Sequence, residues 1–139
     1  MNSPDGHLDQ NRSSARAVRA HGRLLIVEPD DLIRWSITTY LSDWFEVYST
    51  GSSDQAESLL RERSMTALVL SDELSEQAAD RLRDRARDRS PNVRIVHTVA
   101  ECTVETPDGI AYACIEKPFE LRRLAEILGV TEAELARCR

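Results

Sequence analysis

The chain has 139 residues, of which 41% are hydrophobic and 30% are charged, and its formal net charge is -6 at pH 7. This length and composition are those of one compact domain with a hydrophobic core. The acidic balance argues against direct binding of nucleic acid, which normally requires a basic surface. No apolar run approaches the roughly 20 residues of a membrane span, and no signal-peptide core follows the first methionine. We therefore expect a cytoplasmic protein without a membrane contact.

The first segment, residues 1–22, is polar and lacks a sustained hydrophobic period. This composition predicts a flexible N-terminal arm. Arg12, Arg16 and Arg19 recur every three or four residues, so a transient basic helix is the alternative.

Short apolar runs alternate with amphipathic stretches from residue 23 onward. Continuous apolar runs predict strands over 24–27, 45–49, 67–71, 93–98 and 112–116. Helical spacing of apolar residues predicts helices over 31–42, after a turn at 50–53, over 76–89 and over 120–128. Residues 100–110 contain Pro107 and Gly109 and predict at most a stunted helix. The sequence TEAE at 131–134 matches a capping box, which predicts one or two further helical turns.

Strands that alternate with helices in this way predict an α/β domain with a parallel sheet covered on both faces. In such sheets the binding crevice lies outside the carboxyl ends of the strands. The polar residues there are Glu28 after the first strand, Asp72 after the third, Thr98 in the fourth and Lys117 after the fifth. Lys117 is the only lysine among 18 basic residues. Its presence indicates a position that needs a compact, flexible ammonium.

In these segments the sequence resembles the receiver domain of two-component response regulators. The matching stretches are LLIVEPDDLIR, ALVLSDEL, RIVHT and IEKPFELRRL. The resemblance covers residues 23–129 and leaves 130–139 as a short C-terminal helical extension. It implies a flavodoxin-like, doubly wound sheet of five parallel strands in the order 2-1-3-4-5. It also implies a signalling module and not an enzyme.

The resemblance implies a role for each of these polar residues. Asp72 matches the phosphoacceptor, since a carboxylate can attack a phosphoryl group to give an acyl phosphate. Thr98 matches the hydroxyl that hydrogen-bonds the phosphoryl group. Lys117 matches the lysine that pairs with that group, and Pro118 follows in what the family usually makes a cis peptide.

The metal ligands implied by the resemblance are Glu28, Asp72 and the backbone carbonyl of Leu74. Pro29 stands where the family has a second acid that usually touches magnesium directly, and it offers only a backbone carbonyl. Asp30 could substitute, although it should point elsewhere as the helix begins, and Pro29 could instead be the first helical residue. We expect Mg²⁺ to bind weakly or not at all.

Other positions also depart from the family pattern. Acidic side chains follow the acceptor, a valine follows Thr98, a cysteine replaces the aromatic switch residue, and a proline interrupts the fourth helix. These residues are Glu73, Glu76, Val99, Cys114 and Pro107. They indicate a remodelled output face.

Two hypotheses remain open. The first is a stand-alone receiver that accepts a phosphoryl group on Asp72 from a sensor histidine kinase or a phosphotransfer protein and then binds a downstream protein target. The second is a pseudo-receiver that keeps the fold as a phosphorylation-independent interaction module. A nucleotide-binding or hydrolase function is disfavoured, because neither a glycine-rich loop nor a nucleophile elbow is present.

Trp35 and the cysteines carry weaker signals. Trp35 lies off the apolar stripe of the first helix, so it is a possible interface residue, for a homodimer or another partner. A tryptophan in this position is more often partly buried at the helix edge. Cys102, Cys114 and Cys138 are widely spaced without a CxxC pair, which predicts reduced thiols.

Overall fold

The computed structural model describes residues 21–101 and 113–137. Five parallel strands form one sheet in the order β2-β1-β3-β4-β5, as predicted. The strands are β1 (Arg23–Val27), β2 (Glu46–Thr50), β3 (Ala67–Ser71), β4 (Arg94–Val99) and β5 (Ala113–Glu116). Each strand bound lies within one residue of the bound expected from the apolar runs, and the bounds of β3 agree.

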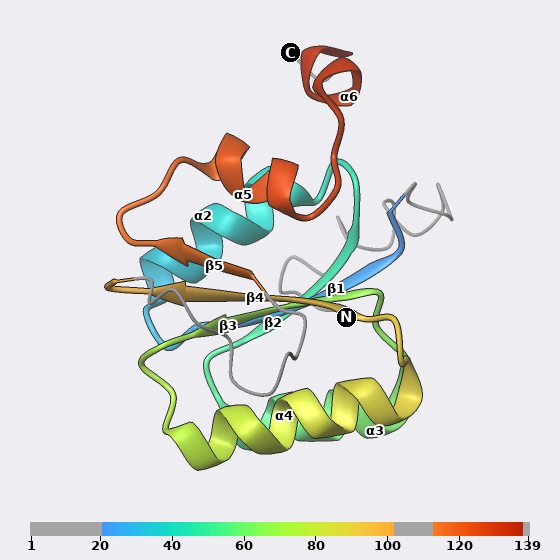
Figure 1. The fold of residues 1–139 in the computed structure, drawn as a ribbon, viewed down its shortest axis with the longest axis vertical. Helices are drawn as coiled ribbons and strands as arrows, with labels where there is room; N and C mark the ends of the chain where they lie inside the picture. Colours follow the sequence, from blue (N-terminus) through green and yellow to red (C-terminus); the bar gives the residue numbers. More distant parts are fainter. Residues whose placement is uncertain (1–20, 102–112, 138–139) are drawn as a thin grey trace, which may run out of the picture.

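The helices are α2 (Asp31–Leu41), α3 (Ser53–Glu62), α4 (Glu76–Arg89), α5 (Leu121–Ile127) and α6 (Glu132–Arg137). Figure 1 shows α2 and α5 on one face of the sheet and α3 and α4 on the other. The short α6 follows α5 and, in this view, lies on the same side of the sheet and farther from it than α5. None of the described helices is long and apolar enough to cross a membrane.

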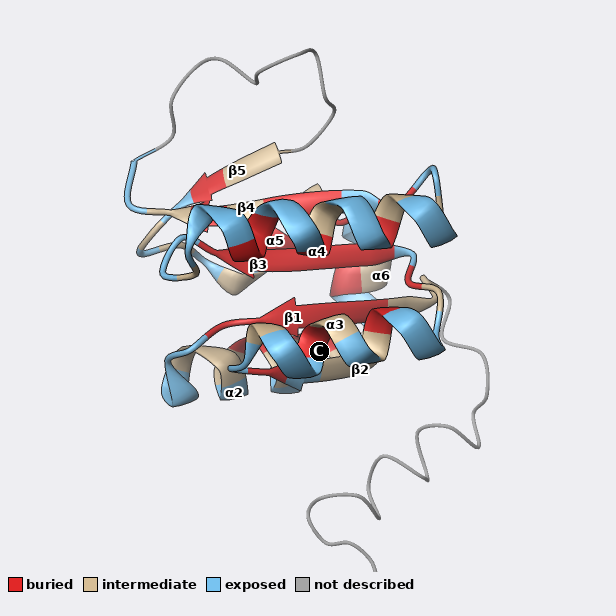
Figure 2. Ribbon diagram, turned by 90° about the horizontal axis from the view of Figure 1, so that it is seen from below, coloured by how far each residue is buried: buried red, intermediate tan, exposed pale blue. Residues whose placement is uncertain are grey.

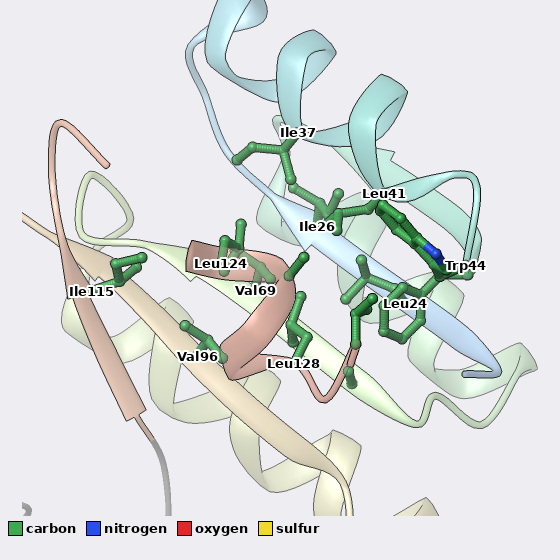
Figure 3. Packing of buried hydrophobic residues seen from close by; sticks show 14 of the residues in the cluster. Leu24, Ile26, Ile37, Leu41, Trp44, Val69, Val96, Ile115, Leu124 and Leu128 are labelled. Carbon is green, nitrogen blue, oxygen red and sulfur yellow. The ribbon is translucent and has the colours of Figure 1, made fainter. Parts of the chain in front are cut away.

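Two hydrophobic cores lie on the two faces of the sheet. Every residue of the central strand β3 is buried, and the exposed surfaces of the helices face away from the sheet (Figure 2). On the face covered by α2 and α5, Ile26 and Val69 of the sheet pack against Ile37 and Leu124 (Figure 3). Each such side chain contributes roughly 1.5–3 kcal/mol when it is fully buried. Burial on both faces explains why the central strands read as continuous apolar runs.

The helix ends agree with the local sequence. Asp30, Ser52 and Ser75 are the N-caps of α2, α3 and α4, and each accepts a hydrogen bond from a backbone amide of the first turn. Gly129 follows α5 with a φ of 102°, and the amides of Gly129 and Val130 donate to Glu126 and Ala125. This is a Schellman motif, which needs a residue such as glycine in the left-handed region.

Two expectations from the sequence need correction. Because Asp30 is the N-cap of α2, Pro29 precedes the helix and is not its first residue. Cys114 is disulfide-bonded, so the expectation of three reduced thiols is wrong. Spacing along the chain cannot reveal which cysteines the fold brings together. The expectations for residues 1–20, 102–112 and 138–139 lie outside the described residues.

Candidate functional site

The carboxyl ends of four strands bring the predicted residues to one place. Glu28 directly follows β1, Asp72 follows β3, Thr98 lies in β4, and Lys117 follows β5. The parallel register aligns the last three. Ser71, next to Asp72, pairs with Thr98, and Thr98 pairs with Ile115, two residues before Lys117. The amide of Asp72 donates to the Thr98 carbonyl at 2.9 Å, and that of Lys117 donates to the Val99 carbonyl at 2.7 Å.

The Lys117 ammonium lies among oxygen atoms from two strands. Its Nζ donates to Asp72 Oδ1 and to Ser71 Oγ, each at 3.2 Å. Two further carboxylates lie slightly farther from Nζ, with Glu28 Oε1 at 3.6 Å and Glu73 Oε2 at 3.8 Å. The Lys117–Pro118 peptide is cis, which agrees with the conformation implied by the resemblance. One cation therefore faces three carboxylates.

Asp72 is accessible to solvent, with about a third of its side chain (34%) exposed, whereas Glu28 is buried. Its Oδ2 accepts a hydrogen bond from the Ala100 amide at 2.9 Å, while Oδ1 accepts from Lys117. Burial raises the pKa of Asp72, but the Ala100 amide and the Lys117 ammonium together outweigh it, so the pKa lies below its usual value. Asp72 is therefore an ionised carboxylate at neutral pH.

Two buried oxygen atoms in this pocket lack a hydrogen-bond partner among the described residues. They are Oε1 of Glu28 and Oγ1 of Thr98, and each residue is only 1% exposed. The second oxygen of the Glu28 carboxylate, Oε2, accepts from the Asp30 amide at 2.9 Å. Buried polar atoms without a partner are costly in a protein interior, and they often mark functional sites.

Three contributors to the site were missed by the sequence analysis. The Ser71 hydroxyl contacts Lys117, the Ala100 amide holds Asp72, and the Arg34 guanidinium donates to the Glu28 carbonyl at 2.7 Å. Glycine at position 51 leaves room for this guanidinium, because a Cβ there would lie 2.8 Å from Arg34 Nη1. A backbone amide has no sequence signal, and one arginine among many is inconspicuous.

Of the predicted metal ligands, Glu28 and Asp72 both lie close to Lys117 Nζ, at 3.6 and 3.2 Å. Pro29 has no side-chain oxygen, and the Asp30 carboxylate caps α2 by accepting from the Ile33 amide at 2.9 Å. The Leu74 amide donates to the Ser71 carbonyl, and its side chain packs against the α3–α4 core. Among the residues that the structure describes, no group of three or more His, Cys, Asp or Glu side chains could hold a metal ion.

The remaining predicted positions lie around this pocket. Val99 is half-buried at the end of β4, and Glu76 is exposed in the first turn of α4. The aromatic side chains of α2 and its following turn differ sharply, because Trp35 is 64% exposed and Trp44 only 5%. Leu32, one turn before Trp35, is 70% exposed. These two residues form an exposed apolar pair on the outer side of α2.

Solved structures of receiver domains share this fold at low sequence identity. The chemotaxis protein CheY4 of Vibrio cholerae has a TM-score of 0.63 and 18% identity, over 77% of this chain and 95% of that protein. A CheY-like receiver domain from Methanospirillum hungatei has a TM-score of 0.65 and 21% identity, over 76% and 88%. The chain has the receiver-domain fold.

A third similar structure contains a modified aspartic acid. It is a response regulator from Burkholderia pseudomallei with a phosphorylated aspartic acid and a calcium ion, with a TM-score of 0.65 and 16% identity over 84% of this chain and 71% of that protein. No family model matches the sequence, and no curated protein matches it significantly. The likeness is therefore one of fold.

Proposed function

We propose that this chain is a receiver module of two-component signalling and that Asp72 is its phosphoacceptor. The observation that carries the proposal is the convergence of an ionised Asp72, the Lys117 ammonium 3.2 Å from its Oδ1, and the unpartnered Thr98 hydroxyl in one pocket. The same three residue types in this fold suit an acceptor, a charge partner and a hydroxyl donor. The phosphorylated aspartic acid of the receiver-fold neighbour from Burkholderia pseudomallei supports the proposal.

The proposed reaction transfers a phosphoryl group from a phosphohistidine to Asp72. A carboxylate oxygen of Asp72 forms a bond to phosphorus, the phosphorus–nitrogen bond of the donor breaks, and the donor imidazole takes up a proton. Lys117 offsets the negative charge that gathers on the phosphoryl oxygens. Thr98 Oγ1 then has an acceptor for its proton, which removes one buried hydroxyl without a partner.

The partners follow from this reaction. A sensor histidine kinase or a phosphotransfer protein supplies the phosphoryl group, and a downstream protein target responds to the change in the loops around Asp72. The exposed pair of Leu32 and Trp35 on α2 is our candidate contact surface for a partner protein or for a homodimer.

A second function is favoured by the charges of the pocket. Glu28, Asp72 and Glu73 all lie within 3.8 Å of Lys117, so two negative charges remain unmatched before any phosphoryl group arrives. This excess disfavours a dianionic donor. A pseudo-receiver, which binds partners without being phosphorylated, is therefore the alternative.

Intact mass spectrometry tests the proposal. The wild type, Asp72→Asn and the control Asp80→Asn are incubated with acetyl phosphate or phosphoramidate, with and without magnesium. We expect one phosphoryl adduct on the wild type and on the control, and none on Asp72→Asn. Asp80 is a suitable control because it is an exposed carboxylate on α4. No adduct on the wild type with either donor or magnesium condition would leave the pseudo-receiver as the function.

A further inference from the structure

We infer that Lys117 is the resident cation of this pocket and that the pocket does not form a divalent-metal site, although the fold family implies one. The inference rests on the proposed function, in that it concerns the pocket around the proposed acceptor Asp72. It assigns to Glu28 the role of a positioning residue for the Lys117 ammonium, in place of a metal ligand. The argument depends on where the available oxygen atoms point.

The side-chain carboxylates beside Pro29 already contact other groups of the protein. One oxygen of Glu28 accepts from the Asp30 amide at 2.9 Å, and the other lies 3.6 Å from Lys117 Nζ. The Asp30 carboxylate accepts from the Ile33 amide, and the Asp31 carboxylate accepts from Arg34 Nη2 at 2.5 Å. In both acids Oδ1 is occupied, by the bond that begins α2 in Asp30 and by the bond that holds Arg34 in Asp31, so each carboxylate is oriented by that bond.

The backbone of the same loop is closed to a metal as well. A proline can offer only its carbonyl oxygen, and here that oxygen lies 3.5 Å from Arg34 Nη1. The same Nη1 donates to the Glu28 carbonyl at 2.7 Å. A guanidinium remains charged at any physiological pH, so a divalent cation bound to either carbonyl would face a fixed positive charge. The absence of a Cβ at Gly51 leaves the room that Arg34 needs.

Magnesium is particularly poorly served by the donors that remain. It requires near-octahedral oxygen coordination at about 2.0–2.1 Å. Asp72 has one oxygen bonded to the Ala100 amide and the other to Lys117. Glu73 lies after the acceptor with more than half of its side chain (54%) exposed. A metal ion would have to displace the Lys117 ammonium from Asp72 and Glu28. It would then be coordinated by at most two firmly placed carboxylates, those of Asp72 and Glu28.

Lys117 brings one positive charge to the carboxylates of the pocket, where a divalent metal ion would bring two. Its ammonium reaches Asp72 and Ser71 directly, and Glu28 holds it from the buried side. Among the described residues, Lys117 is the only cation that pairs with the Glu28 side chain. Lys117 and the Ala100 amide hold the Asp72 carboxylate without a metal, while about a third of that side chain stays exposed.

Direct measurement of metal binding tests this inference. Mn²⁺ serves as the probe, and its binding is followed by the electron paramagnetic resonance signal of free Mn²⁺ and by water-proton relaxation. We expect the wild type to bind no Mn²⁺ at millimolar concentrations. Pro29→Asp supplies the missing carboxylate and should bind Mn²⁺ at least tenfold more tightly than the limit measured for the wild type. Pro29→Asp combined with Asp72→Asn should lose this binding. Urea unfolding confirms that each variant is folded.

The wild-type titration alone can overturn the inference, whatever Pro29→Asp does. Saturable Mn²⁺ binding by the wild type that Asp72→Asn abolishes would place a metal in the pocket. Failure of the proposed function would be seen in the phosphorylation experiment and not in the Mn²⁺ titration. A wild-type phosphoryl adduct that requires magnesium would refute the absence of a metal and support Asp72 as acceptor. No adduct under any condition, together with no Mn²⁺ binding, would refute phosphorylation of the wild type and support the inference.

Discussion

At the carboxyl ends of the strands one ammonium faces three carboxylates, whereas at the amino ends the charged groups are matched. There His21 Nε2 lies 2.9 Å from Glu134 Oε1, and the same carboxylate oxygen accepts from the Thr131 amide at 2.8 Å. Arg23 pairs with Glu46 across the first two strands, with 3.4 Å between Nε and Oε1. The contacts at the amino ends stabilise the fold, and the contact between His21 and Glu134 joins the segment before β1 to α6.

The difference supports the proposal that the function lies at the carboxyl ends. A fold gains nothing from gathering Glu28, Asp72 and Glu73 around a single lysine, since like charges at these distances destabilise the folded state. Such a mismatch indicates a site that is built to act on a charged group. The matched contacts at the amino ends need no such explanation.

Among the charged groups, the largest effect should follow from removal of the lysine. Lys117→Met leaves Glu28 buried opposite no cation, and we expect it to lower the free energy of unfolding by roughly 3 kcal/mol, the lower end for a broken buried ion pair. Urea unfolding at pH 7 measures this value. Arg122→Met, an exposed cation on α5, is the control and should cost less than about 0.5 kcal/mol.

A double variant separates the pair from the loss of lysine packing. If Glu28 is the partner of Lys117, adding Glu28→Gln to Lys117→Met should recover part of the loss, because no buried charge remains unpaired. Strictly additive costs for the two substitutions would show that they act independently and would weaken the contrast between the two ends.

The second effect concerns His97, which lies among charged side chains. Burial, followed by the Arg83 and Arg87 guanidiniums, lowers the pKa of His97 from 6.5 to about 4, against the opposing effect of Asp80. Arg83 Nη1 lies 2.9 Å from His97 Nε2, and because a guanidinium only donates, this nitrogen accepts. His97 is therefore neutral in the folded protein at pH 7.

Acid should therefore weaken the fold through His97. Between about pH 6.5 and 4 the unfolded chain binds a proton at His97 that the folded chain does not, so stability falls as the pH falls through this window. We expect a loss of roughly 2 kcal/mol, measured by urea unfolding at pH 7 and pH 4.5. His97→Gln should flatten this dependence, and an unchanged slope in that variant would assign it to other groups.

A smaller effect belongs to the matched end. Glu134→Gln keeps the capping geometry of α6 but loses the charge opposite His21, and we expect a cost of roughly 0.5–1 kcal/mol. Hydrogen bonds from the Thr131 amide and from His21 hold the pKa of Glu134 below its usual value, so this contribution is present above that value and is lost as the pH falls through the lowered pKa. Glu132→Gln, exposed on the same helix, is the matched control for thermal unfolding.

The smallest effect on stability should come from the tryptophan near the site. Trp35→Ala should change the free energy of unfolding by less than about 0.5 kcal/mol, because most of the side chain is exposed. It should nevertheless weaken self-association or partner binding, followed by sedimentation velocity and by partner titration. Trp44→Ala at the opposite end is the contrast, with an expected loss of roughly 3–5 kcal/mol. Unchanged mass in solution and unchanged partner affinity for Trp35→Ala would remove α2 as the contact surface.

Much of the fold was predictable from local pattern. The continuous apolar run ALVLS predicts a central strand because both faces of a parallel sheet are buried, and all five residues of β3 are. Thr131 and Glu134 form the reciprocal hydrogen bonds that their spacing predicted, and Gly129 ends α5. These features depend on neighbours in sequence, so a single sequence carries their signal.

The sequence by itself determined which chemical groups reach the carboxyl ends of the strands, because strand order and polarity place Glu28, Asp72, Thr98 and Lys117 there. Only the tertiary structure decided how these groups are used. Arg34 reaches the loop carbonyls through its long side chain, and Asp30 turns to cap α2. These orientations depend on contacts between segments that no local pattern encodes, and they are the basis of our proposal that no side chain replaces the acid missing at Pro29.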